Sequence, residues 1–111
     1  MKKLMANKHF LHILKNANPQ LRKNILKDSN PDLIKALCEV CMNTLNGNMK
    51  ISNSTKSQLK KYKKTLRCLA SPKVKLTRKR KLLIQKGGFL PVLLGSLLAG
   101  AVGKLVEHFT Q

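Results

Sequence analysis

Residues 30–47, NPDLIKALCEVCMNTLNG, predict the clearest helix of the chain and fix its fold class as helical. Asn30 is a typical N-cap, Pro31 suits the first helical position, and Asp32 places an acid beside the positive end of the helix dipole. Gly47 supplies the left-handed residue that ends many helices. We therefore expect a helix over residues 31–46, whose apolar face recurs at steps of three and four residues: Leu33, Ile34, Leu37, Cys38, Cys41 and Leu45.

Three further helical segments are predicted on either side of this helix. Residues 4–16 form the first, and the stretch from Asn16 to Pro19 breaks it. Residues 19–28 form the second, with Asn18 as the cap. The third begins at a cap on Ser54 or Thr55 and ends near residue 69, before Pro72. Their apolar stripes are Leu4, Phe10, Leu11 and Leu14; Leu21, Ile25 and Leu26; and Leu59, Tyr62, Leu66 and Leu69. The expected fold is all-α, with a small helical unit of three or four helices within residues 1–69.

The remaining 42 residues divide into a basic linker and a hydrophobic tail. Residues 73–86, KVKLTRKRKLLIQK, hold seven basic residues and no acid. Their mutual repulsion predicts that the linker, residues 70–86, stays extended or interconverts between conformers. Gly87 and Gly88 form a hinge that closes the linker region at residue 88. Residues 89–103 carry no charge and predict a C-terminal hydrophobic helix over about residues 89–108, within a tail of residues 89–111.

Charge is the most informative property of the sequence. The chain has 23 Lys and Arg against 4 Asp and Glu, for a net charge of +19. All of that net charge lies in residues 1–86, while residues 87–111 sum to zero. Such uncompensated charge destabilises a compact chain, and a polyanion relieves the repulsion and releases condensed counterions. Nucleic acid is the expected partner, and an anionic membrane surface is the alternative.

The sequence contains few residues from which a catalytic site could be built. Four acids provide almost no paired-carboxylate chemistry, no glycine-rich phosphate loop is present, and we expect no enzymatic activity and no cofactor. Cys38 and Cys41, with His9 and His12, offer a zinc-site interpretation. The two cysteines share the apolar face of residues 31–46, so we expect core residues and no metal site. Three cysteines in a chain without an apolar signal core indicate a reducing compartment, cytosol or nucleus.

The basic residues of positions 60–86 are the candidate nucleic-acid contacts. The cluster Arg78-Lys79-Arg80-Lys81 is typical of a solvated flexible face, a nuclear-import patch or a polyanion clamp, and the last two are compatible. Because arginine is scarce, we expect binding to phosphates of double-stranded DNA without sequence preference. The candidate contacts are Lys60, Lys61, Lys63, Lys64, Arg67, Lys73, Lys75, Arg78, Lys79, Arg80, Lys81 and Lys86.

The hydrophobic tail has two interpretations. Fifteen helical residues reach about 23 Å, short of the roughly 30 Å hydrocarbon core of a bilayer, although an extension past Lys104 lengthens the segment. Small residues at four-residue steps allow close helix approach and an oligomer through the tail. The alternative to insertion is burial within a larger assembly such as a capsid. The candidate membrane-contact and helix-packing residues are Phe89, Leu90, Pro91, Gly95, Ala99 and Gly103.

Residues 78–106 resemble the adenovirus core protein X family, the precursors of the mu peptide. The resemblance rests on Arg78-Lys79-Arg80-Lys81, on Gly87-Gly88-Phe89-Leu90-Pro91, and on the apolar segment to Val106. The whole chain also resembles small basic proteins of polinton- and adintovirus-type DNA elements. The resemblance implies a virion core protein that condenses the genome and that a viral cysteine protease cuts after the Gly-Gly. The family's site prefers a large apolar residue two positions before the first glycine and tolerates Gln, which here is Gln85.

Two functions follow as hypotheses. The first is a virion core protein, located in the virion and the host nucleus, that binds and condenses packaged DNA and is cleaved between Gly88 and Phe89. The second is a membrane-active capsid component whose tail disrupts or inserts into a host membrane during entry.

Overall fold

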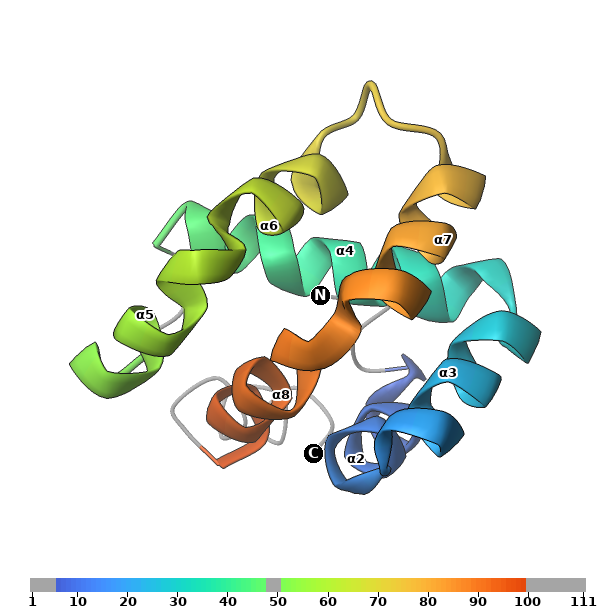
Figure 1. Cartoon of the computed structure of the whole chain (residues 1–111), viewed down its shortest axis with the longest axis horizontal. Helices are drawn as coiled ribbons and strands as arrows, with labels where there is room; N and C mark the ends of the chain where they lie inside the picture. The colour runs from blue at the N-terminus through green and yellow to red at the C-terminus, as the bar shows by residue number, and fades with distance from the viewer. Residues whose placement is uncertain (1–5, 48–50, 100–111) are drawn as a thin grey trace.

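A computed structural model of the protein describes residues 6–47 and 51–99, and every regular element among them is a helix (Figure 1). The all-α prediction is therefore confirmed for this part of the chain. In chain order, the elements are α2 (Lys8–Asn16), α3 (Pro19–Asp28), α4 (Pro31–Leu45), α5 (Asn53–Leu59), the 3₁₀-helix η1 (Lys60–Tyr62), α6 (Lys63–Ala70), α7 (Leu76–Lys86), the 3₁₀-helix η2 (Gly87–Phe89) and α8 (Leu90–Ala99).

Helices α3 and α4 begin as their sequences predict. The side-chain oxygen of Asn18 accepts a hydrogen bond from the Leu21 amide at 2.8 Å, and Asn30 accepts one from Leu33 at 3.0 Å. In each helix a proline occupies the first turn, where its missing N–H costs nothing. The end of α4 is also confirmed, because Gly47 adopts φ +72°, a conformation that side chains with a Cβ rarely take.

The helix predicted to follow α4 is interrupted. Its cap is Ser52, whose hydroxyl accepts from the Thr55 amide at 3.1 Å, and not Ser54 or Thr55 as predicted. Helix α5 tightens into η1 before α6 continues to Ala70. At the tightened turn the ring of Tyr62 packs on Phe89, with centroids 5.5 Å apart. This contact joins residues 27 positions apart, which no local pattern reports.

The basic linker prediction is wrong for residues 76–86, which form the helix α7. Leu83 is 1 % exposed, and Leu76, Leu82 and Ile84 are partly buried against the core. Helix α7 contacts α3, α4 and α6. Apolar burial of this kind stabilises by about 25 cal/mol per Å². It offsets the repulsion that would keep the isolated segment extended, so only residues 71–75 remain a non-helical connection.

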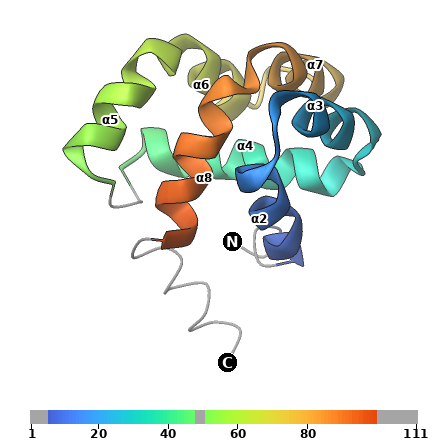
Figure 2. The ribbon, with the colours of Figure 1, turned by 60° about the horizontal axis from the view of Figure 1, so that its bottom comes forward.

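The hydrophobic tail is not separate from the N-terminal unit as far as residue 99. Helix α8 lies between α2 and α5 and contacts both (Figure 2). Its buried residues, together with the last residue of η2, are fully enclosed: Phe89, Leu90, Leu93 and Leu94. The physical reason is the apolar area of these side chains, whose burial against the neighbouring helices stabilises the fold. Leu11 and Leu14 of α2 and Leu59 of α5 belong to the same buried cluster as α8.

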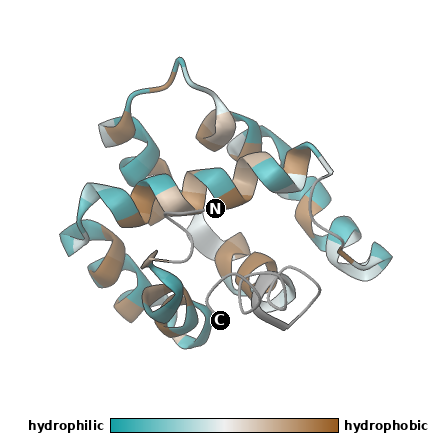
Figure 3. Cartoon of the chain, turned by 180° about the vertical axis from the view of Figure 1, so that it is seen from behind, coloured by the Kyte–Doolittle hydropathy of each residue, from teal (hydrophilic) through white to brown (hydrophobic). Residues whose placement is uncertain are grey.

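The helices are amphipathic, apart from α8. Figure 3 shows hydrophilic and hydrophobic residues alternating along the other helices, whereas α8 is hydrophobic over much of its length. A hydroxyl contact also ties α8 to α5, because Ser96 Oγ donates to Thr55 Oγ1 at 3.0 Å. Half-buried Gly95 does not lie at a close helix contact, since a Cβ there would meet nothing within 4 Å. Gly103 and the predicted extension to residue 108 lie outside the described residues.

Candidate nucleic-acid interface

Positive charge is concentrated in the second half of the described fold. Residues 51–86 contain thirteen Lys and Arg and no Asp or Glu. The acids of the described residues, Asp28, Asp32 and Glu39, all belong to α3 and α4. The fold therefore separates a strongly basic portion, α5 to α7, from a portion in which acids partly compensate the bases.

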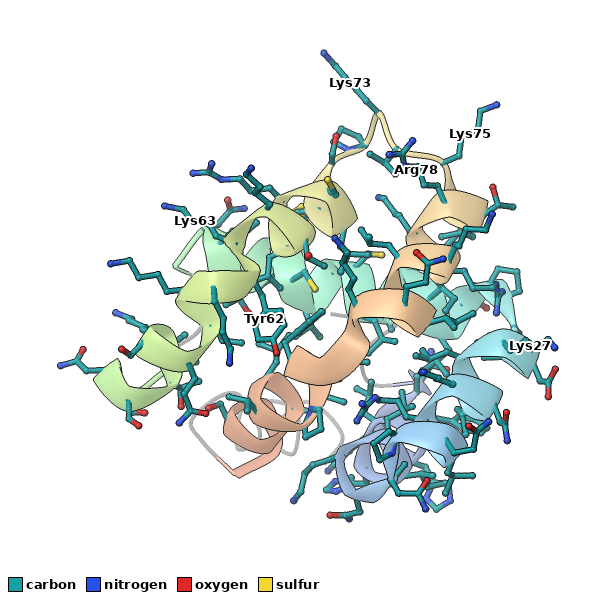
Figure 4. The ribbon with its side chains drawn as sticks, viewed as in Figure 1. Lys27, Tyr62, Lys63, Lys73, Lys75 and Arg78 are labelled. Atoms are coloured by element: carbon teal, nitrogen blue, oxygen red, sulfur yellow. The ribbon has the colours of Figure 1, made fainter. Side chains whose placement is uncertain are left out.

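Ten of the twelve predicted contacts are exposed, and two are not. We call the exposed ten the basic surface; they are Lys60, Lys61, Lys63, Lys64, Arg67, Lys73, Lys75, Arg78, Lys81 and Lys86. Lys79 and Arg80 are half-buried, so the cluster of residues 78–81 is divided between the surface and the interior. In Figure 4, Lys63, Lys73 and Lys75 point away from the molecule, whereas Lys27 lies on the other side of the view from Lys63.

The connection between α6 and α7 holds two lysines outward. Ser71 ends α6, and its amide donates to the Cys68 carbonyl at 3.3 Å. The Ser71 hydroxyl accepts from the Lys73 amide at 3.2 Å, and its carbonyl accepts from Val74 at 3.4 Å. Val74 is half-buried, while Lys73 and Lys75 on either side of it are exposed. In this turn, half-buried Val74 thus has an exposed lysine on each side.

Arg80 has a structural role that the sequence interpretation missed. Its Nη1 donates to the backbone carbonyls of Leu26 and Ser29, each at 2.7 Å, and to Ser29 Oγ at 3.0 Å. These acceptors are at the C-terminal end of α3, where the last carbonyls lack helical partners and the dipole is negative. Arg80 therefore joins α7 to α3, and its predicted contact with DNA stays a prediction. Helical periodicity could have indicated this role, since residue 80 lies between the apolar positions Leu76 and Leu83 on the face of α7 that packs inward.

The two cysteines of α4 are core residues, as predicted. Cys38 is 8 % exposed and Cys41 is fully buried. Burial raises the pKa of both thiols, and the positive charge of Lys79 opposes this rise at each. Within residues 6–47 and 51–99, no group of three or more His, Cys, Asp or Glu side chains is placed to hold a metal ion. Cys68 is exposed on α6, beside Arg67.

The Gly-Gly pair is part of a packed turn and not an exposed hinge. Gly87 is buried, and a Cβ on it would lie 3.3 Å from Leu90 Cδ1. Gly88 is exposed, but a Cβ there would lie 3.5 Å from the Tyr62 hydroxyl. Phe89 is fully buried. The turn η2 is therefore packed against side chains of the fold, an arrangement that a separate tail would not have.

No protein-family model, curated protein or solved structure matches this chain. In the part of the chain that the structure describes, none of the helices has the length and apolar character needed to cross a membrane.

Proposed function

We propose that this protein binds duplex DNA through the basic surface, without sequence preference, and neutralises it for packaging. The observation that carries the proposal is the run of thirteen cations without an acid over residues 51–86, of which the basic surface exposes ten. Side chains that end in ammonium groups contact phosphates as point charges and specify little sequence. Eight of the ten are lysines, which favours contacts to the DNA backbone.

The resemblance of residues 78–106 to the adenovirus core protein X family supports a packaged viral genome as the DNA. Under this proposal the protein belongs to the virion and, before packaging, to the host nucleus. The membrane-active alternative has less support, because Phe89, Leu90, Leu93 and Leu94 are enclosed by the protein's own helices. Insertion of these residues into a membrane would first require α8 to leave α2 and α5.

Salt dependence tests the proposal. Fluorescence anisotropy with a labelled mixed-sequence duplex should show affinity falling on the order of a thousandfold between 50 and 200 mM salt if about six phosphates are neutralised. An unrelated duplex of the same length should compete equally well. A salt slope near zero, or a strong preference for one duplex, would contradict the proposal.

A matched pair of triple variants locates the interface. Replacing Lys63, Lys73 and Lys75 by Gln removes three charges of the basic surface. Replacing Lys23, Lys27 and Lys35 by Gln removes three exposed charges from α3 and α4. The first variant should lower the salt slope by about 0.9 for each phosphate that is no longer neutralised, and the second should lower it much less. Equal effects would mean that net charge alone, with no defined surface, governs binding.

A further inference from the structure

Helices α6 and α7 form a two-helix unit supported by α4. Residues 71–75 connect them, and α4, α6 and α7 contact one another pairwise (Figure 1). In helix-turn-helix proteins, the second helix of such a unit lies in the major groove and the first crosses the DNA backbone. Helix α7 has eleven residues, about 16 Å of helix, which is enough to span a groove about 12 Å wide.

The outward face of α7 carries the side-chain types that base edges require. Thr77, Arg78, Lys81 and Gln85 are exposed, and together with half-buried Leu82 they line one open surface depression. Arg and Lys donate to guanine O6 and N7, and Gln pairs with adenine N6 and N7. The exposed polar positions of α6, in contrast, include Lys63, Lys64 and Arg67 but no amide.

The inward face of α7 fixes how this outward face is presented. Leu83 is buried, and Arg80 is bound to the carbonyls of Leu26 and Ser29 at the end of α3. Residues 80 and 83 thus hold α7 from one side, while residues 78, 81 and 85 are exposed. A helix held by such contacts keeps a constant orientation, whereas the extended basic segment expected from sequence would not.

We propose that α7 enters the major groove of duplex DNA, with Arg78, Lys81 and Gln85 directed at base edges. The lysines of α6 and of residues 71–75 then contact the flanking phosphates. This inference rests on the proposed DNA binding and adds the groove and the helix that occupies it. Each such contact favours guanine over another base by about 1–3 kcal/mol, but guanines occur throughout mixed-sequence DNA, so two mixed-sequence duplexes of the same length should bind about equally well.

Dimethyl sulfate footprinting of the full-length protein on a mixed-sequence duplex tests the inference. The reagent methylates guanine N7 in the major groove and adenine N3 in the minor groove. At saturating protein and low salt, methylation of N7 should fall several-fold along the duplex, while methylation of adenine N3 should stay unchanged. Circular dichroism of each variant used below confirms that it is folded.

Two charge-matched double variants separate groove contacts from phosphate contacts. Arg78→Gln with Lys81→Gln should abolish the N7 protection even where protein saturates the DNA. Lys63→Gln with Lys64→Gln, on α6, removes the same charge and should weaken binding but keep the protection at saturation. Binding without N7 protection, or with adenine N3 protected instead, overturns the inference and leaves the proposed function intact. Absence of salt-dependent binding overturns the proposed function itself.

Discussion

Arg78 and Arg80, two positions apart in the sequence, have different roles. Arg78 is exposed on the basic surface, whereas Arg80 is bound to the C-terminal end of α3. The acceptors of Arg80 lie 51 and 54 positions away in the chain, so no local pattern could assign them. Sequence reasoning correctly placed both residues in a basic run, but it could not divide them between binding and structure.

We predict that Arg80→Gln lowers the free energy of unfolding by about 2 kcal/mol, because charge-assisted hydrogen bonds to two carbonyls are lost. Urea denaturation followed by circular dichroism measures this. The matched variant Arg78→Gln removes the same charge from an exposed position, and its stability should change by about 0.5 kcal/mol or less. Equal destabilisation by the two variants would show that the bonds of Arg80 contribute nothing beyond its charge.

The buried thiols of Cys38 and Cys41 predict a loss of stability at alkaline pH. Burial raises the pKa of both thiols above the ordinary value of 9.0. The folded chain therefore keeps them neutral, and the unfolded chain ionises them first. Their contribution to stability is complete below the unfolded pKa and declines from about pH 8 upward, until the pH reaches the raised pKa of each thiol in the folded chain.

Free energies of unfolding measured across this alkaline range test the thiol prediction. The double variant Cys38→Ala/Cys41→Ala should be less stable at neutral pH because it packs less well, and its decline should be shallower. Cys68→Ala provides the control, because Cys68 is exposed. A decline of the same steepness in all three proteins would show that groups other than these two thiols cause it.

At the scale of elements, the sequence predicts where a helix begins better than which other helices it packs against. Asn18 and Asn30 were identified as caps because capping depends on residues three positions apart. The sequence of α7 alone predicts an extended segment, because only the apolar surfaces of α3, α4 and α6 offset its charge repulsion. The apolar composition of α8 fits a bilayer or a protein core equally well, and only the helices around it decide between the two.

The burial of α8 leads to a quantitative prediction about Leu93. Leu93 is fully buried, and replacing it by Ala should lower the free energy of unfolding by about 2–5 kcal/mol, the usual range for a buried leucine. Leu45→Ala, at a position 36 % exposed on α4, is the matched control and should cost much less. A separate tail would predict no change for Leu93→Ala, so an effect as small as that of the control would contradict the packing of α8.

For the molecule as a whole, α8 links stability to the proposed processing. The cut proposed between Gly88 and Phe89 falls within η2, directly before four fully buried residues: Phe89, Leu90, Leu93 and Leu94. Proteases bind extended segments, and this turn is closed by Tyr62 and Leu90. Cleavage therefore requires local opening of η2 and α8. Each buried side chain contributes about 1.5–3 kcal/mol, so four together approach the total stability of a typical domain.

We predict that an adenoviral-type cysteine protease cuts the folded chain slowly and cuts the Leu93→Ala variant faster, since the variant opens more often. The product, residues 1–88, retains every Lys and Arg except Lys104 and thus nearly the full salt slope of DNA binding. Its helical circular dichroism should fall once residues 89–111 dissociate, because α2 and α5 lose their shared partner.

Mass spectrometry of mature particles and of the protease reaction tests whether the chain is cut between Gly88 and Phe89. Ends at Gly88 and Phe89, with rates that rise as stability falls, would support a precursor whose fold controls its own cutting. Particles that contain an active protease but only chains spanning residue 88 would show that the Gly-Gly pair serves packing alone. Cleavage at the same rate in both proteins would show that η2 opens independently of α8.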